Sequence, residues 1–199
     1  SNDTLTATAP SLELAVEGRN IAIRYKNLRE IEVRYYELDV EFAFSTQPFA
    51  GADGASAAFV KPNFQETRAL DKAASQMAYE LPQQFWQKNI LVEVRSAGLV
   101  RSRQYFANAL DVRFLESYGQ VAVTEPTSDK PLAKTYVKVF ARMPDGAVRF
   151  HKDGYTDLRG RFDYVSLSDD PSRGAKRYAV LVLDEERGAV IREINPPTR

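Results

Sequence analysis

The sequence predicts an all-β chain built from two antiparallel β-sandwich modules. Apolar and polar residues alternate in many short stretches, which is the period of a half-buried strand. The stretches recur about every 8–12 residues, and Gly, Pro, Asn or Asp residues separate them. This spacing favours antiparallel sandwiches over a parallel α/β sheet, in which longer helical patterns alternate with the strands.

Composition limits the classes of function. The chain has 199 residues, of which 44% are hydrophobic, enough for packed cores in two modules of about 100 residues each. The 27 Lys and Arg residues balance 27 Asp and Glu residues, so nucleic acid is not an expected partner. The absence of cysteine excludes disulfides, thiolate nucleophiles and zinc–thiolate sites. No apolar run is long enough for membrane insertion, and no cofactor is predicted.

The domain prediction has three parts. Residues 1–10 are expected to be a flexible lead-in, whose Ser1-Asn2 start is typical of a tag remnant. Residues 11–117 form the first module and residues 118–199 the second, because the pattern resets near Ser117 without a long linker. The chain is therefore expected to be a fragment of a larger protein.

In the first module, alternation predicts strands over 12–16, 21–25, 31–44, 90–94, 100–106 and 110–114. The apolar phase slips between Tyr35 and Tyr36, which predicts a β-bulge or a sharp bend at this point of one long strand. Residues 45–58 read as a loop. Residues 68–81 fit either a short helix, placed near 66–78, or a strand that ends before Pro82, and both alternatives stay open.

In the second module, strands are predicted over 120–124, 136–143, 148–150, 162–167, 178–183 and 189–194. Val137, Val139 and Ala141 should share one face. The Pro144-Asp145-Gly146 segment predicts a hairpin turn, and the continuously apolar stretch 178–183 predicts a central strand.

The second module carries Lys130-Pro131-Leu132 and then Thr156-Asp157-Leu158-Arg159-Gly160-Arg161-Phe162. In that turn, Asp157 can accept hydrogen bonds from the backbone, Gly160 can supply a positive φ, and Phe162 can enter the core. With these segments, residues 118–199 resemble the carboxypeptidase regulatory-like (transthyretin-type) domains. That resemblance implies a β-sandwich and leaves function open.

The first module carries Tyr25-Lys26-Asn27-Leu28, followed by the segment from Glu32 to Asp39. It looks like the Ig- or macroglobulin-like domains of bacterial α2-macroglobulin-like proteins, which trap proteases. That chemistry often uses a thioester cysteine, which this chain lacks, so a scaffold role remains. The resemblance implies an extracytoplasmic location, either periplasmic or on the cell surface, where adhesion is a common role.

Two sets of side chains are candidates for chemistry. His151, the single histidine, could act as a base with Asp153, Asp157 or Ser166, but no Gly-x-Ser-x-Gly nucleophile elbow accompanies it. We therefore predict no catalytic residue and an exposed histidine at a strand end. Asp153, Asp157 and Asp163 could bind Ca²⁺, but their spacing is not that of an EF-hand, and turn-stabilising carboxylates are the preferred interpretation.

Phe85-Trp86 is the sharpest candidate for ligand binding, as an aromatic platform for a sugar ring or a protein, against the alternative of a core anchor. The sequence thus predicts a non-catalytic structural or protein-binding module of a larger bacterial exported or surface protein. Its partners would be proteins or other domains of the same chain, contacted through residues 46–58, residues 169–174 or an open sheet edge. A carbohydrate-binding module is the first alternative, and a hydrolase is the second.

Overall fold

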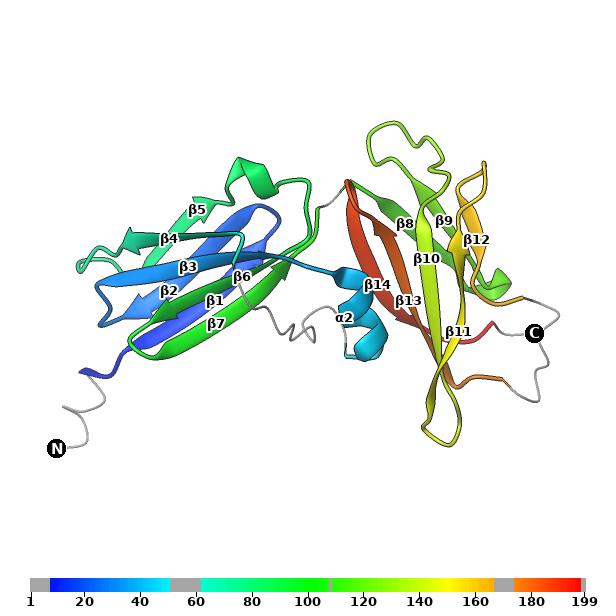
Figure 1. Cartoon of the computed structure of the whole chain (residues 1–199), viewed down its shortest axis with the longest axis horizontal. Helices are drawn as coiled ribbons and strands as arrows, with labels where there is room; N and C mark the ends of the chain where they lie inside the picture. The colour runs from blue at the N-terminus through cyan, green and yellow to red at the C-terminus, as the bar shows by residue number, and fades with distance from the viewer. Residues whose placement is uncertain (1–7, 51–61, 108, 167–173, 198–199) are drawn as a thin grey trace. The chain divides into compact units, whose positions relative to one another are not determined.

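The structure is a computed structural model that describes residues 8–50, 62–107, 109–166 and 174–197. Strands dominate, as the sequence predicts (Figure 1). The chain forms two compact units, the first comprising Ser1–Leu38 and Ala57–Phe106, the second Asp39–Ser56 and Ala107–Arg199. The second unit therefore includes a segment that precedes most of the first unit's strands, and it starts before the boundary that the sequence suggests near Ser117.

The first unit is a sandwich of two antiparallel sheets. One sheet has the order β1-β2-β5 and the other β4-β3-β6-β7. Their bounds are β1 Ser11–Glu17, β2 Asn20–Lys26, β3 Glu30–Glu37, β4 Phe64–Ala69, β5 Gln76–Glu80, β6 Ile90–Ser96 and β7 Leu99–Tyr105, with a 3₁₀-helix, η1, at Gln83–Phe85. Alternate residues such as Ile21, Ile23 and Val33 are buried between the sheets, which explains the two-residue period of the sequence.

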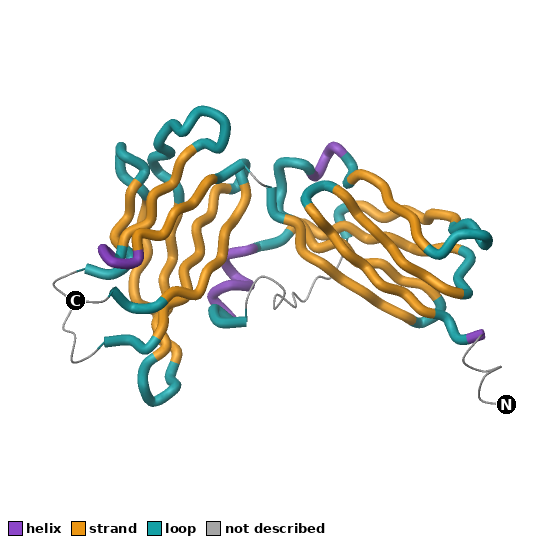
Figure 2. Tube along the Cα trace, turned by 180° about the vertical axis from the view of Figure 1, so that it is seen from behind, coloured by secondary structure: helices purple, strands orange, loops and turns teal. Residues whose placement is uncertain are grey.

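The second unit is also a two-sheet sandwich, with the orders β11-β10-β13-β14 and β12-β9-β8. Figure 2 shows the strand layers of this unit and its helix. The bounds are α2 Val40–Thr46, β8 Asp111–Leu115, η2 Glu116–Tyr118, β9 Gln120–Thr124, β10 Tyr136–Arg142, β11 Val148–Tyr155, β12 Arg161–Asp163, β13 Arg177–Asp184 and β14 Gly188–Ile194.

Several details of the second unit confirm the sequence interpretation. Val137, Val139 and Ala141 all belong to the core. The strand β13 lies between β10 and β14, as its unbroken apolar run predicts. The amide of Gly146 donates to the carbonyl of Met143, which closes the predicted hairpin turn. The segments from 51 to 61 and from 167 to 173 lie outside the described residues, so most of the two predicted partner loops do too.

The prediction of one bulged strand over 31–44 is wrong. The strand β3 ends at Glu37, and its register is unbroken where Tyr35 pairs with Val92 and Tyr36 with Leu91. Residues from Val40 onward form α2 instead. Asp39 explains the change, because its side chain accepts a hydrogen bond from the amide of Phe42 and caps the first turn of the helix.

The alternative of a short helix near 66–78 is also wrong, since β4 and β5 occupy this region. The two strands lie at the ends of the two sheets of the first unit. Met77 and Tyr79 pack against the core at the two-residue spacing of a strand. The gain from this packing outweighs the helical spacing of Leu70, Ala74 and Met77, because a short helix is marginal without a packed face.

Candidate functional site

One face of the sheet β11-β10-β13-β14 has features of a binding surface. Along β10 and β13, alternate residues such as Val139 and Val180 point into the core. The residues between them lie on the opposite side of the sheet. We call this side the outer face, and it consists of Tyr136, Lys138, Phe140, Arg142, Phe150, Asp153, Tyr155, Ala179 and Leu181.

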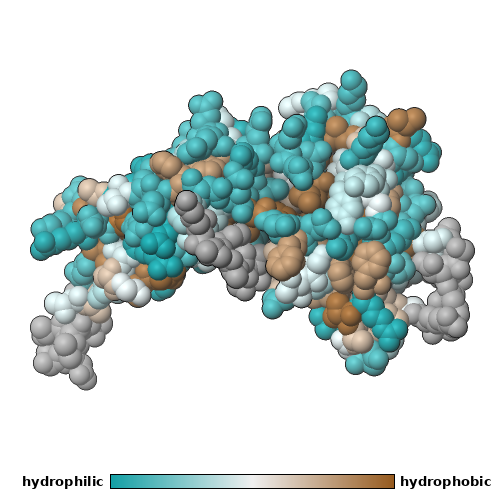
Figure 3. Space-filling model, viewed as in Figure 1, coloured by the Kyte–Doolittle hydropathy of each residue, from teal (hydrophilic) through white to brown (hydrophobic). Residues whose placement is uncertain are grey.

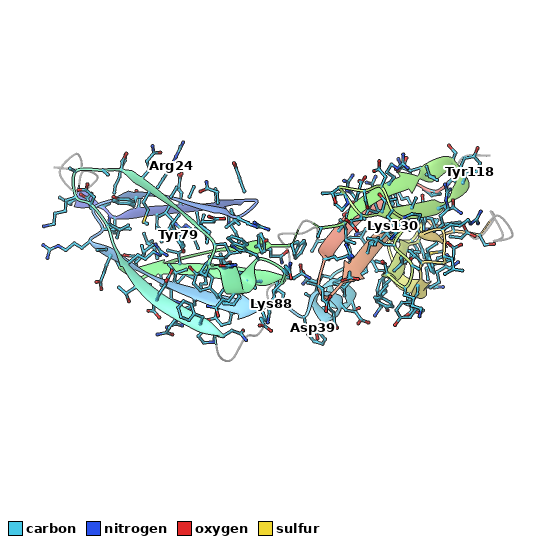
Figure 4. All side chains as sticks on the ribbon, turned by 90° about the horizontal axis from the view of Figure 1, so that it is seen from above. Arg24, Asp39, Tyr79, Lys88, Tyr118 and Lys130 are labelled. Carbon is cyan, nitrogen blue, oxygen red and sulfur yellow. The ribbon has the colours of Figure 1, made fainter. Side chains whose placement is uncertain are left out.

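Helix α2 packs on the outer face against β13. Val40 and Phe44 are both buried and lie four residues apart, so they share one side of the helix. The ring of Phe44 meets the ring of Phe140 edge-on, with 5.6 Å between centroids. Asp39 lies at the start of this helix, and Figure 4 labels its position. The capped turn thus directs an apolar side of the helix onto the sheet.

Polar groups fix the same helix at its first turn. Oε1 of Glu41 accepts hydrogen bonds from the hydroxyl of Tyr136 and from Nζ of Lys138, both at 3.3 Å. The Tyr136 hydroxyl also donates to Oδ2 of Asp153 at 2.7 Å. Burial, the hydrogen bond to Asp153 and the negative charge of Glu41 together raise the pKa of Tyr136. Tyr136 therefore stays neutral, and the two carboxylates share its single hydroxyl hydrogen, with Asp153 as the nearer acceptor.

Three aromatic side chains of α2 and β11 are largely exposed. The exposed fraction is 70% for Phe42, 55% for Phe150 and 64% for Tyr155. Brown and tan apolar side chains are visible on this part of the second unit in Figure 3. Phe150 packs edge-on against Phe140, with centroids 5.8 Å apart, so its position is fixed by the sheet. Large apolar side chains exposed together are typical of surfaces that bind another protein.

The two residues of the predicted aromatic platform lie in the first unit, where Phe85 is buried and Trp86 is partly exposed. Phe85 is only 3% exposed and belongs to the core of the first unit. The indole Nε1 of Trp86 donates to the carbonyl of Leu81 at 2.6 Å. The guanidinium of Arg19 lies 4.0 Å from the centroid of the Trp86 ring. These contacts fix the position of the Trp86 ring.

The predicted catalytic and metal-binding candidates have separate surroundings. His151 is the extra residue of a β-bulge on β11, and its ring centroid is 5.3 Å from that of Tyr178. Asp153 accepts from Tyr136, whereas Asp163 accepts from Nε2 of Gln120 at 2.8 Å. Within the described ranges, no three His, Asp or Glu side chains are grouped so that they could hold a metal ion.

The predicted turn residues lie at the junction of β11 and β12. Oδ1 of Asp157 accepts from the amides of Arg159 and Arg161 at 2.9 and 3.0 Å. Gly160 has a φ of 72°, and a Cβ atom there would lie 2.4 Å from the carbonyl oxygen of Val123. Phe162 is partly buried and packs against the core. The hydrogen bonds to Asp157 lower its pKa, that to Arg161 having the larger effect.

Apart from Asp153, sequence reasoning missed the residues of the outer face. Glu41 and Lys138 are 97 positions apart, so no local pattern joins them. The signal that was available is the Asp39 cap two residues before Glu41, which marks a helix start. With the helix recognised, Val40 and Phe44 would have stood out as an apolar side in need of a partner.

Each of the two modules is similar to a known family of protein domains. Residues 10–92 match the family described as the AbpF seventh immunoglobulin-like domain. Residues 109–199 match the family described as the AbpF C-terminal domain. Actin-binding protein F of Dictyostelium discoideum is 34% identical over 194 residues, which is 97% of this chain. The chain spans 8% of the length of that relative.

Two solved structures share the fold. Crystal structures of alpha-2-macroglobulin from Escherichia coli superpose with a TM-score of 0.56 over domains NIE-MG1 and 0.57 over MG0-NIE-MG1. They cover 94% and 92% of this chain, and this chain covers 97% and 64% of theirs. The sequence identities are 13% and 12%, so the likeness concerns the fold alone. It supports the macroglobulin-like sandwich that the sequence suggested, whereas none of these comparisons supports a transthyretin-type second module.

The expected extracytoplasmic location is corrected by these comparisons. The 34% identical relative is named for binding actin and comes from Dictyostelium discoideum. The origin in a bacterial exported protein therefore has no support. In the parts that the structure describes, no helix has both the length and the apolar character needed to cross a membrane. The chain is therefore a tandem pair of immunoglobulin-like β-sandwich domains, and each domain is similar to a domain named for AbpF.

Proposed function

We propose that this chain is a non-catalytic pair of repeat modules that supplies a protein-binding surface to a longer actin-binding protein. The observation that carries the proposal is the 34% identity to actin-binding protein F across 97% of the chain. The two family matches, which fall in succession along the chain, support a role as tandem repeats. Such repeats act by presenting a surface or by setting the spacing of other domains.

The outer face of the second unit is the surface that we assign to binding. Phe150 and Tyr155 project from β11 with 55% and 64% of their surface exposed. Each packs against a neighbour on β10, with centroids 5.8 Å apart for Phe150 and Phe140 and 5.5 Å apart for Tyr155 and Tyr136. A partner therefore meets rings that are already ordered, which lowers the entropy lost on binding. Aromatic anchors of this kind contribute most of the energy of many interfaces.

Co-sedimentation with filamentous actin tests the proposal. The whole chain is expected to pellet with filaments in a saturable manner. The variant Phe150→Thr with Tyr155→Thr should raise Kd by about tenfold or more, because it removes two aromatic anchors. Threonine keeps a β-branched side chain in the strand, so the fold should survive.

The matched control is Leu158→Thr, which removes a side chain that is 89% exposed in the turn between β11 and β12. It should pellet like the unaltered chain. Failure of the unaltered chain to pellet at any filament concentration would reject actin as the partner. Equal pelleting of the double variant and the control would reject the outer face as the surface. Far-ultraviolet circular dichroism checks that each variant is folded.

A further inference from the structure

The outer face holds a buried apolar strip. Ala179 and Leu181 alternate with the core residues Tyr178, Val180 and Val182 of β13, so they lie on the outer side of the sheet. Both are nevertheless 0% exposed. Helix α2 contacts β13, and its own Val40 and Phe44 are buried. An apolar side of a helix and an apolar strip of a sheet thus cover each other in this unit.

The chain from Glu41 to Phe49 contacts successive outer residues of β10 in order. Glu41 bonds to Tyr136 and Lys138, and the ring of Phe44 packs on Phe140. Farther along, the guanidinium of Arg142 lies 4.5 Å from the centroid of the Phe49 ring. These contacts alternate between charge and aromatic surface. The outer side of β10 is therefore complementary to a segment that carries an acidic residue, an aromatic residue three positions later and then a second aromatic residue.

The helix that makes these contacts has little stability of its own. It comprises seven residues, Val40–Thr46. Isolated helices shorter than about 12–15 residues are marginal in water. The Asp39 cap and the hydrogen bond from Thr46 Oγ1 to the carbonyl of Phe42 stabilise its two ends, but most of its stability must come from docking. We consequently expect α2 to lose its helical structure when it leaves the sheet.

We infer that the outer face is a helix-binding surface that α2 occupies as a built-in ligand. The partner it fits is an amphipathic protein helix with a β-branched residue and a phenylalanine four positions apart and an acidic residue between them, the arrangement of Val40, Glu41 and Phe44. This inference rests on the proposed protein-binding function, and it names the class of partner. Such a partner competes with α2, so release of α2 controls access to Leu181 and Phe140.

A peptide with the sequence of residues 38–50 and a fluorescein label is the probe. It is titrated with the whole chain, either unaltered or with Val40→Asp and Phe44→Asp, and binding is followed by fluorescence anisotropy. In the unaltered chain α2 occupies the surface, which weakens apparent binding in proportion to the small open fraction. The variant's own helix cannot dock, so the peptide should bind it at least about tenfold tighter.

Two matched controls define the surface. A peptide that carries the same two aspartates should not bind, and Leu181→Asp added to the open variant should abolish binding. If the doubly substituted chain fails to fold, Phe44→Ala decides the matter, with an expected affinity between those of the unaltered and open chains. Equal binding by all chains, or equal binding of the aspartate peptide, would overturn the inference.

The assay contains no actin, so its outcome is separate from that of the pelleting experiment. Tight peptide binding without pelleting would support the helix-binding surface and reject actin as its binding partner. Normal pelleting without peptide binding would keep the proposed function and reject helix recognition.

Discussion

Phe162 lies directly over Gly154, such that a Cβ atom on Gly154 would be 2.7 Å from Cε2 of the ring. The two residues belong to different sheets, because Gly154 is on β11 and Phe162 is on β12. The glycine therefore lets an aromatic ring close the side of the second sandwich. The ammonium group of Lys152, also on β11, lies 5.1 Å from the centroid of the same ring.

Gly154→Ala should destabilise the second unit by about 1–3 kcal/mol, the usual cost of adding a carbon to a filled site. The measurement is urea unfolding followed by far-ultraviolet circular dichroism. Phe162→Leu in the same chain should recover part of the loss, since a smaller side chain leaves room for the added carbon. Strict additivity of the two substitutions would contradict the close packing of these residues.

Thr156→Val should also destabilise the second unit. The Thr156 side chain is buried, and its hydroxyl accepts from the amide of Thr135 and donates to the carbonyl of Leu132 at 2.6 Å. Valine has the same shape but cannot replace either bond, and each unsatisfied buried group costs about 1–3 kcal/mol. Urea unfolding measures the loss.

The control for this change is Thr156→Ser, which keeps the hydroxyl and should lose less stability than the valine variant. Trp86, the single tryptophan, lies in the first unit. The unfolding transition of the first unit, followed by the fluorescence of Trp86, should therefore be the same in these variants as in the unaltered chain. Equal losses for the serine and valine variants would show that the hydrogen bonds matter less than packing.

Asp157→Asn should weaken the dependence of the chain's stability on pH in the acid range. The amides of Arg161 and Arg159 lower the pKa of Asp157 in the folded chain. The folded state therefore keeps the carboxylate ionised at pH values where the unfolded chain takes up a proton. This contribution is complete above the ordinary carboxyl pKa of about 4 and disappears as pH falls through the lower pKa of the folded state.

Asparagine keeps an oxygen acceptor for the amides but does not titrate in this range. Thermal midpoints from neutral pH down to about pH 2 should thus fall less steeply for the asparagine variant than for the unaltered chain. Asp157→Ala separates the two effects, because it removes the acceptor and should lower the midpoint at every pH. Parallel profiles for the unaltered and asparagine chains would refute the role of the charge.

Tyr79→Phe should flatten the alkaline side of the profile for the first unit. The Tyr79 hydroxyl lies 2.7 Å from that of Tyr35 between the sheets of this unit (Figure 4). Burial raises the pKa of Tyr79 to about 12, despite the opposing effects of the bond to Tyr35 and the charge of Arg68. Stability is complete below the unfolded pKa of about 10 and is lost as pH rises through the folded pKa.

The measurement is urea unfolding at several alkaline pH values, followed by the fluorescence of Trp86. The variant should show a smaller decrease of unfolding free energy with pH than the unaltered chain. Tyr118→Phe is the matched control, since Tyr118 is 68% exposed and belongs to the second unit. If the tryptophan transition has the same pH dependence in all three chains, the proton on Tyr79 has no part in stability.

Much of the fold can be predicted from the two-residue periodicity of apolar residues. Where this prediction is wrong, the reason lies in the local sequence. Alternation in a half-buried strand predicts one shared face for Val137, Val139 and Ala141, and all three belong to the core. Val40 and Phe44 satisfy alternation equally well, since positions four apart share a face in both a strand and a helix. Phe42, 70% exposed between them, is the residue that a strand would have buried.

The candidate site was less predictable than the fold. The contact of Glu41 with Tyr136 joins segments 95 residues apart, and it depends on a helix that alternation had hidden. Phe85 and Trp86 are candidates by sequence because large aromatic residues are common in binding sites, but such residues are equally common in cores. Only burial, which is set by the arrangement of both sheets, separates these two uses of the same residues.

The helix on the second sandwich is encoded between two strands of the first. Asp39–Ser56 belongs to the second unit, although the sequence on both sides of it belongs to the other. A duplication or recombination event that copied only residues 107–199 would leave this helix behind and uncover Leu181. We therefore expect the two domains to have been duplicated and inherited together, because the second domain keeps its helix only when both are copied.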